Sequence, residues 1–509
     1  MKLSAGILLL AWLATAAAHA QISQFEHIIL VIQENRTPDN LFQGLCVPPY
    51  GKSGSCNVPP GPGQYNIQTK NWLDKSAAGG IIQPQLVELG PPLGTVGNYD
   101  LGHGHPDWVS MCDVAANVCK MDGAAGVTCG PHDCGPKKKE SCCLANPQFR
   151  YVDNSQSILN PYLDLATQYG WANYMFQTNQ GPSFPAHQFL FGGTSAPTAL
   201  QDSQAIFASE NMHSTGIGGT QAHAGCTAPN GEKGTHPITV ALIQPPDNET
   251  QFVYPCFEHE TMGDFLTPVP MGKPRPPQLS WRYYAPNATS IWTAPNAIQH
   301  ICVSNGPGGK CTGPVWTANV DQTFNPSDVL QDISNCVLRS VSWVIPTGWN
   351  SDHAHGNDGG GPSWVASIVN AVGGNTTCNK GGYWKNTAIV ITWDDWGGWY
   401  DHEPPTILKG IQGDYQYGFR VPLIVVSAYT PKGYIDNDRH DFGSILRFVE
   451  NNFGIQEGAL HFADERASTN LSTFFNLKMA PRPFQEIKAP KNAQFFINDK
   501  RPHTDPDTD

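Results

Sequence analysis

Two adjacent acids, Asp394 and Asp395, stand directly after a short apolar run over residues 388–392 that is typical of a buried strand. Carboxylates buried side by side repel one another and lose hydration, so they persist only beside a compensating cation. Gly397 and Gly398 follow, and such glycines permit a sharp turn or a close backbone approach to a ligand. Because open α/β sheets bind ligands at the carboxyl ends of their strands, this stretch predicts a metal site on an α/β sheet.

A second polar pair, Glu34 and Asn35, follows an apolar run over residues 26–33 that is typical of a central parallel strand. With Asp394 and Asp395 these residues offer four oxygen ligands, a hard set that suits Mg²⁺, Ca²⁺ or Mn²⁺ better than a thiolate-preferring metal. Each pair also has a structural interpretation, as a solvated turn or as a helix cap. The prediction of a metal site therefore depends on the joint occurrence of the two pairs.

Ser183 follows a Gly-Pro turn and stands at or near the N-cap of a short predicted helix, where free N–H groups and the helix dipole favour a phosphate. A serine hydroxyl is a poor nucleophile unless a base or a metal assists it. His103 and His353 offer groups for acid–base catalysis or phosphate contact. This combination predicts phosphoester hydrolysis through a phosphoseryl intermediate, with a histidine protonating the departing alkoxide. Taken singly, the serine is more often a structural cap and each histidine a packing or surface residue.

The elements that must position these residues alternate along the chain. Further strand patterns occur at 172–176, 280–285, 340–346 and 420–427, and helical patterns at about 153–169, 363–372 and 441–451. Such alternation indicates a mainly parallel sheet covered on both faces, an α/β fold of the α/β/α sandwich type. The 51 Gly and 43 Pro indicate long loop insertions, notably over residues 45–100. Residues 200–330 otherwise show no clear pattern of elements, and the run at 280–285 is expected to be an edge strand.

Composition narrows the function further. The net charge of −13 argues against a nucleic-acid partner, although an acidic protein can bind phosphate esters where a metal supplies positive charge. Residues 1–20 match a signal peptide, with a basic start, an apolar core and an Ala-x-Ala site, which predicts a secreted or periplasmic protein. The 14 cysteines then favour disulfides. A zinc knot involving His132 is the alternative for the six cysteines between Cys112 and Cys143.

Several motifs together carry a family resemblance. They are residues 27–42 (HIILVIQENRTPDNLF), 181–185 (GPSFP), 351–353 (SDH), 392–405 (TWDDWGGWYDHEPP), 418–422 (GFRVP) and 440–450 (HDFGSILRFVE). At these motifs the sequence resembles the bacterial phosphoesterase family of secreted phospholipases C and acid phosphatases, within the alkaline phosphatase superfamily. The resemblance implies an alkaline-phosphatase-like sandwich with one divalent metal ion (Mg, Ca, Mn or Zn). The implied site residues are the ligands Glu34, Asn35, Asp394 and Asp395, the nucleophile Ser183, and His103 (or His105) and His353 near the phosphate or leaving group.

The sequence departs from the family pattern at three places. Ala186 follows Pro185 where the family usually carries Asn, and Asn173 stands where Asp is common. A His-rich stretch is reduced to His300. These departures leave open which residue is the leaving-group acid. They also leave the substrate open between a phosphate ester and a phospholipid. A phospholipid substrate is compatible with transient contact with a membrane surface.

The expected organisation is a signal peptide at 1–20, a catalytic domain at 21–480 with a cysteine-rich insert at about 110–148, and a C-terminal tail at 481–509. Two other functions stay open. One is a sulfatase-like hydrolase of the same superfamily, which the absence of a Cys-x-Pro-x-Arg motif disfavours. The other is a catalytically inactive, secreted surface- or glycan-binding protein. The sequence does not specify an oligomeric state.

Overall fold

The computed structural model describes most of the chain beyond residue 22. The described ranges are 23–115, 118–130, 133–134, 140–198, 201, 206–210, 222–227, 236–237, 240–244, 248–253, 255–267, 279–306, 309–411 and 415–506. The predicted signal peptide and His132 lie outside these ranges. Within them, no helix is long and apolar enough to cross a membrane.

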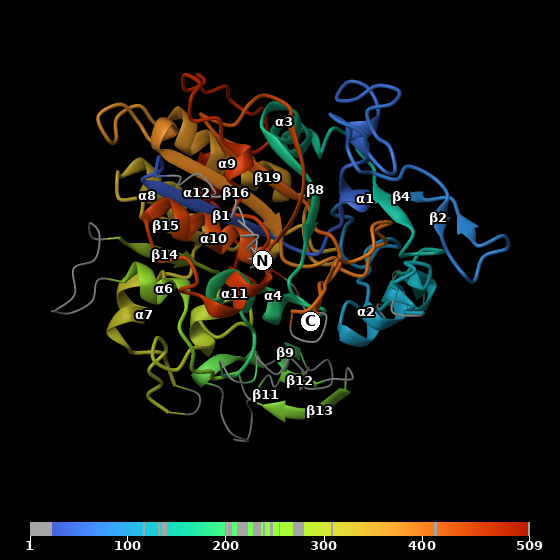
Figure 1. The fold of residues 1–509 in the computed structure, drawn as a ribbon, viewed down its shortest axis with the longest axis horizontal. Helices are drawn as coiled ribbons and strands as arrows, with labels where there is room; N and C mark the ends of the chain where they lie inside the picture. Colours follow the sequence, from blue (N-terminus) through green and yellow to red (C-terminus); the bar gives the residue numbers. More distant parts are fainter. Residues whose placement is uncertain are drawn as a thin grey trace, which may run out of the picture.

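A seven-stranded sheet forms the centre of the fold (Figure 1). Its order is β14 (Trp281–Tyr284), β15 (Val341–Val344), β1 (His27–Gln33), β16 (Thr387–Trp393), β19 (Leu423–Ser427), β8 (Gly170–Phe176) and β20 (Tyr434–Asp441). All neighbours are parallel except those of β19, which runs antiparallel to β16 and β8. The expected mainly parallel sheet is confirmed, and so is the edge position of the strand expected over 280–285. Antiparallel neighbours need no crossover helix, and the described residues between β16 and β19 contain none.

Two groups of helices flank this sheet, as Figure 1 shows. The first group comprises α3 (Asn160–Gln168), α8 (Asp328–Ser334), α9 (Gly361–Gly374) and α12 (Ala493–Ile497), which pack around α9. The second comprises α4 (Ser183–Gly192), α6 (Met262–Leu266), α10 (Phe442–Phe453) and α11 (His461–Arg466). The arrangement is the expected α/β/α sandwich.

Local sequence explains where these elements begin and end. The apolar residues 28–32 of β1 are all buried, as a central strand requires. Helix α3 begins at Asn160, within the helical pattern over 153–169 and at the place that Pro161 favours, because proline is favourable in the first turn of a helix. Helix α10 begins where the Asp441 carboxylate accepts the Ser444 N–H at 3.1 Å, an N-terminal cap. Strand β20 was not predicted from the sequence, because its residues are mostly polar and form no apolar pattern.

The insertions lie beside the sandwich. Between β1 and β8 the chain forms α1 (Pro38–Leu41), α2 (His105–Cys112) and β2 to β7 (Trp72–Leu73, Ile81–Ile82, Gln85–Val87, Asp133–Cys134, Glu140–Ser141 and Arg150–Val152), at the right in Figure 1. Further on, β9 (Phe207–Glu210), β12 (Val240–Gln244) and β13 (Asn248–Val253) form a small sheet. Further short elements of the described residues are β10 (Ala222–His223), β11 (His236–Pro237), α7 (Pro314–Asn319), β17 (Ile407–Leu408) and β18 (Tyr415–Gln416).

All fourteen cysteines pair in seven disulfides. The six cysteines of the insert pair among themselves, as Cys112–Cys119, Cys129–Cys143 and Cys134–Cys142. The disulfide prediction is confirmed, and no cysteine remains to ligate zinc. Such density of disulfides fits an extracellular or periplasmic protein.

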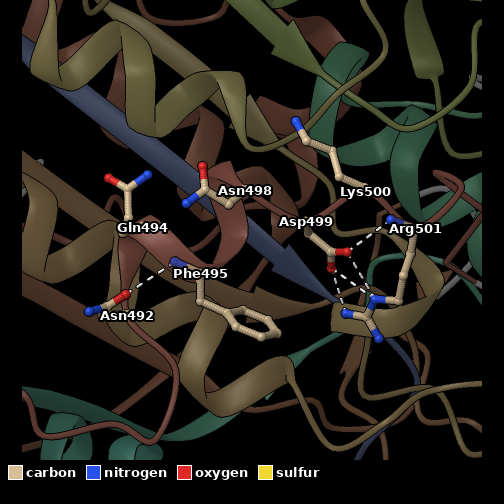
Figure 2. Close-up of a pocket in the computed structure, with 7 residues that line it drawn as sticks. All are labelled: Asn492, Gln494, Phe495, Asn498, Asp499, Lys500 and Arg501. Atoms are coloured by element: carbon tan, nitrogen blue, oxygen red, sulfur yellow. Dashed lines mark hydrogen bonds and ion pairs between the residues drawn. The ribbon is translucent and has the colours of Figure 1, made fainter.

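The C-terminal segment, expected as a tail, packs on the sandwich through residue 506. Phe496 of α12 meets Trp364 of α9 edge-on at 5.2 Å, and the Thr504 carbonyl accepts the Gly348 N–H at 3.1 Å. Residues 492–501 line a pocket in this segment, where Figure 2 shows Arg501 turned onto Asp499. None of the predicted site residues lines this pocket.

Candidate active site at the carboxyl ends of the strands

The two acidic pairs meet because β1 and β16 are parallel neighbours in matched register. Gln33 stands opposite Trp393, so Glu34 and Asp394 leave the sheet side by side. The Asp394 N–H donates to the Gln33 carbonyl at 2.9 Å, which continues the ladder by one residue. The strand ends are therefore adjacent although about 360 residues separate them in the sequence.

Backbone N–H groups orient the two aspartates. Asp394 Oδ1 accepts the N–H of Asn35 at 3.1 Å and that of Asp395 at 2.7 Å. Asp395 Oδ1 accepts the Gly397 N–H at 2.7 Å. Each carboxylate is thereby held by one oxygen, and its second oxygen is directed to the interior of the site.

The glycine pair is required by close packing at this edge. Gly397 has a φ of +62°, and a Cβ there would lie 2.4 Å from the Asn35 carbonyl oxygen. Gly398 has a φ of +72°, and a Cβ there would lie 2.5 Å from Leu101 Cβ. Both positions combine a left-handed backbone with no room for a side chain. The glycines allow the segments of Asn35 and Leu101 to pack closely against this turn. The sequence predicted a sharp turn or a close approach here, but not these neighbours.

Ser183 is the first residue of α4, with Pro182 at the N-cap. Its buried hydroxyl donates to Asp395 Oδ2 at 3.2 Å and lies 3.5 Å from Glu34 Oε2. Pro182, and not Ser183, is the N-cap residue, and the hydroxyl contacts of Ser183 are to acids rather than to the N–H groups of its own helix. The hydroxyl instead faces the acids.

His187 lies one turn further along α4, on the same face as Ser183. It was not among the site residues predicted from the sequence. Its Nε2 atom is 3.5 Å from Glu34 Oε1 and 3.7 Å from Asp394 Oδ2. Burial lowers the pKa of the imidazole to about 4 against the opposing effect of Asp394, so the ring is neutral. The four-residue spacing from Ser183 was the available signal, because residues i and i+4 share a helix face.

His103 and His353 form a second cluster with Asp100, and His103 joins this cluster to Asn35. His103 Nδ1 donates to the Leu101 carbonyl at 2.6 Å, and its Nε2 therefore accepts the Asn35 side-chain N–H at 3.1 Å. His353 Nε2 lies 3.4 Å from Asp100 Oδ1, and the two imidazole rings are 5.8 Å apart. Of the two histidines offered by the 103–105 segment, His103 reaches the site, whereas His105 stacks on Trp108.

The residue before His353 anchors the site to the core. The Asp352 carboxylate accepts hydrogen bonds from the Tyr162 hydroxyl at 2.7 Å and the Trp393 indole at 3.0 Å. Arg36 donates to the Asp352 carbonyl at 2.7 Å. Burial outweighs these contacts and raises the pKa of Asp352 to about 6. The loop that carries His353 is thereby tied to the end of β16 and to the segment after Asn35.

Asp401 belongs to a separate buried ion pair. Arg420 donates to Asp401 Oδ2 at 2.9 Å and lies 3.6 Å from Asp39 Oδ1, while His402 Nδ1 lies 2.7 Å from Asp39 Oδ2. Arg420 and His402 together partner the two acids, so charged and polar groups of the protein hold this cluster. It joins the loop after β16 to α1 and to the segment before β19.

Two of the sequence departures lie in structural networks. Asn173 accepts the Asn66 N–H at 2.8 Å and donates to the Gln64 carbonyl at 2.8 Å. His300 pairs with Glu258 at 2.7 Å and Asp264 at 2.8 Å, which raises its pKa to about 9. Neither residue contacts the acids at the strand ends.

The cluster fits a divalent cation. Asn35 Oδ1, His187 Nε2 and Asp394 Oδ2 are buried without a hydrogen-bond partner among the described residues, whereas buried polar atoms are almost always paired. Glu34, His187 and Asp394 place one ligand atom each within 4.8 Å of one another. A cation would satisfy these atoms and compensate the buried Glu34, Asp394 and Asp395 carboxylates. All predicted site residues therefore converge on one place.

Comparisons with known proteins agree with this geometry. The family model of the Phosphoesterase family matches residues 150–456. Phospholipase C B of Mycobacterium tuberculosis is 27% identical over 178 residues, covering 31% of this chain and 33% of the relative. Non-hemolytic phospholipase C of Burkholderia pseudomallei is 30% identical over 149 residues, covering 25% and 21%, and non-specific phospholipase C1 of Arabidopsis thaliana is 26% identical over 163 residues, covering 28% and 29%.

The chain thus aligns with a third or less of the length of each of these curated relatives. Among solved structures, that of Ps i-CgsB in complex with k-i-k-neocarrahexaose has a TM-score of 0.32 and 13% identity, covering 62% of this chain and 70% of its own. That likeness is too low to carry an argument.

Proposed function

The chain belongs to the Phosphoesterase family, and from that premise we propose that it is an exported, metal-dependent hydrolase of phosphate esters, of acid phosphatase or phospholipase C type. The observation that carries the proposal is the Ser183 hydroxyl, which stands at the start of α4 within 3.2 Å of Asp395 Oδ2. A buried serine that faces acids rather than capping its helix is placed for nucleophilic chemistry.

In the proposed reaction Ser183 Oγ forms a bond to phosphorus while the ester oxygen departs, and water then hydrolyses the phosphoserine. Asp395 Oδ2 takes the hydroxyl proton, and the N–H groups of the first turn of α4 receive the phosphate oxygens. A divalent ion bound by Glu34, Asn35, Asp394 and Asp395 would stabilise the alkoxide and polarise the phosphoryl group.

The two histidines take different roles in this proposal. His103 donates from Nδ1 to the Leu101 carbonyl and accepts the Asn35 side-chain N–H at Nε2, so it orients the Asn35 amide. His353 Nε2 lies 3.4 Å from Asp100 Oδ1, so this imidazole and the carboxylate are arranged as a pair that can pass a proton to a leaving group. We therefore assign His353 as the acid that gives its proton to the departing alkoxide.

Two observations support a phosphate ester or phospholipid substrate: the chemistry of the site, and the relatives, which are named as phospholipases C. Export is supported by the seven disulfides and by the signal-peptide pattern of residues 1–20. The convergence of all predicted site residues favours this function over an inactive, surface-binding scaffold.

The test is a substrate panel with the purified full-length protein, comparing a chromogenic phosphomonoester, a phosphocholine diester and phospholipid vesicles. Turnover of at least one phosphate ester is expected, and the preferred member separates the phosphatase type from the phospholipase type. Chelation should abolish turnover, and adding back a divalent ion should restore it. A verified metal-free sample that keeps its full rate contradicts metal dependence, and inactivity on the whole panel with metal bound contradicts the proposed function.

A further inference from the structure

The His187 imidazole lies against the predicted metal ligands but is no part of the four-oxygen set. We propose that His187 is a further ligand of the metal centre through Nε2, and that the centre prefers a borderline transition metal such as Zn²⁺ to Ca²⁺ or Mg²⁺. The inference rests on the proposed function, because it presumes a metal at the strand ends.

The interatomic distances support a shared ion rather than direct hydrogen bonds. Nε2 stands 3.5 Å from Glu34 Oε1 and 3.7 Å from Asp394 Oδ2. A hydrogen bond would bring such atoms to about 2.9 Å. Two neighbouring ligands of one zinc ion, with bonds of about 2.0–2.1 Å, lie about 3.0 Å apart around a six-coordinate ion and about 3.4 Å apart around a four-coordinate one. The observed separations are close to the latter value.

The other ring nitrogen is oriented as in known metal-binding histidines. Nδ1 lies 3.4 Å from the Tyr283 hydroxyl, whose own proton goes to the Trp292 carbonyl at 2.8 Å. The Tyr283 oxygen is thus left to accept from Nδ1, and this tautomer places the Nε2 lone pair toward the acids. The Trp292 indole in turn donates to Glu34 Oε2 at 3.2 Å, which holds the opposite ligand.

Helix α4 presents both functional side chains at once. Ser183 and His187 are four residues apart, so the hydroxyl and the imidazole leave the same face, and both contact the Glu34 carboxylate. Both side chains are fully buried on a regular element. The position of the nucleophile is therefore coupled to the position of the ion by a single rigid turn.

A nitrogen ligand changes the metal that the site selects. Carboxylate and carbonyl oxygens suit Mg²⁺, Ca²⁺ and Mn²⁺, whereas imidazole shifts the preference to Zn²⁺ and its neighbours. The oxygen-only set read from the sequence pointed to the first group. With His187 included, one imidazole joins the oxygen ligands, and this moves the preference of the site toward Zn²⁺.

The first test measures metal affinity and does not depend on activity. Metal-free wild-type protein is titrated with Zn²⁺ and, separately, with Ca²⁺, alongside His187→Gln and the matched control His259→Gln. His259 is also a buried histidine, but its Nδ1 meets the Glu260 carbonyl. We expect His187→Gln to weaken Zn²⁺ binding by about 100-fold or more and Ca²⁺ binding by less than about threefold. The control should match wild type.

The second test identifies the ligand in the wild-type protein, so it holds even if His187→Gln fails to fold. A histidine bound to Co²⁺ shows its remaining ring N–H as a far-shifted exchangeable proton signal in NMR. We expect one such signal in the Co²⁺-loaded protein, assigned to His187 by histidine labelling and lost in His187→Gln. Wild-type protein that binds Zn²⁺ or Co²⁺ without this signal, or His187→Gln with unchanged Zn²⁺ affinity, overturns the inference alone. Wild-type protein that binds no metal overturns metal dependence as well.

Discussion

Replacing Ser183 with alanine separates catalysis from folding, because the two depend on this side chain to very different degrees. The hydroxyl makes no capping bond, and its two contacts, at 3.2 and 3.5 Å, go to Asp395 and Glu34. Losing such hydrogen bonds costs about 1 kcal/mol of stability. Losing the nucleophile of an organised site lowers kcat by about 10⁴–10⁶-fold, or about 5–8 kcal/mol of transition-state stabilisation. The helix, the acids and both histidines remain in place.

The assay compares kcat on a chromogenic phosphate ester with the urea unfolding midpoint for the same preparations. Acid quenching during turnover, followed by mass spectrometry, should detect phosphoserine at position 183 in wild type only. Ser195→Ala is the matched control, since this buried serine follows the other end of α4 and donates to the Ala208 carbonyl at 2.8 Å. A Ser183→Ala variant that keeps its rate within tenfold of wild type, or phosphate trapped on another residue, refutes the assignment.

Two further predictions concern buried charges outside the site. Arg420→Met leaves Asp401 and Asp39 buried without their cation. It should lower the free energy of unfolding, measured by urea denaturation, by about 3–5 kcal/mol, and a loss below about 1 kcal/mol contradicts this prediction. Burial and Asp464 raise the pKa of Glu450 to about 9, so the stability that its proton provides is complete below about pH 4.5 and is lost as pH rises through 9. The free energy of unfolding of Glu450→Gln should therefore exceed that of wild type by about 3 kcal/mol at pH 7 and equal it near pH 4.5. Urea denaturation across this pH range that gives the same pH dependence for both proteins rules this out.

Strongly patterned elements were predictable because burial on both faces leaves a continuous apolar run, as in β1 and β16. Strand β20 was missed because its polar residues carry no such run, and it forms because β8 offers a parallel edge. The direction of β19 was equally hidden, since an apolar strand reads the same in either orientation. The cysteine pairing also came only from the structure, because spacing does not specify connectivity.

For the site, the residue types in the sequence determined the chemistry. Acids after buried strands, a serine after a turn and scattered histidines indicated a metal and a phosphate ester, because few other roles retain such groups. The sequence alone also set the need for glycine at Gly397 and Gly398, although not the neighbours that require it. These inferences are local, since they depend on residue type and immediate context.

Only the tertiary structure decided which residues meet. The register of β1 with β16 brings Glu34 beside Asp394, and the start of α4 brings Ser183 onto Asp395. It also brings in His187, which no motif had marked, and sets Asp401 apart with Arg420. Interactions across such distances along the chain depend on packing, which local pattern does not encode.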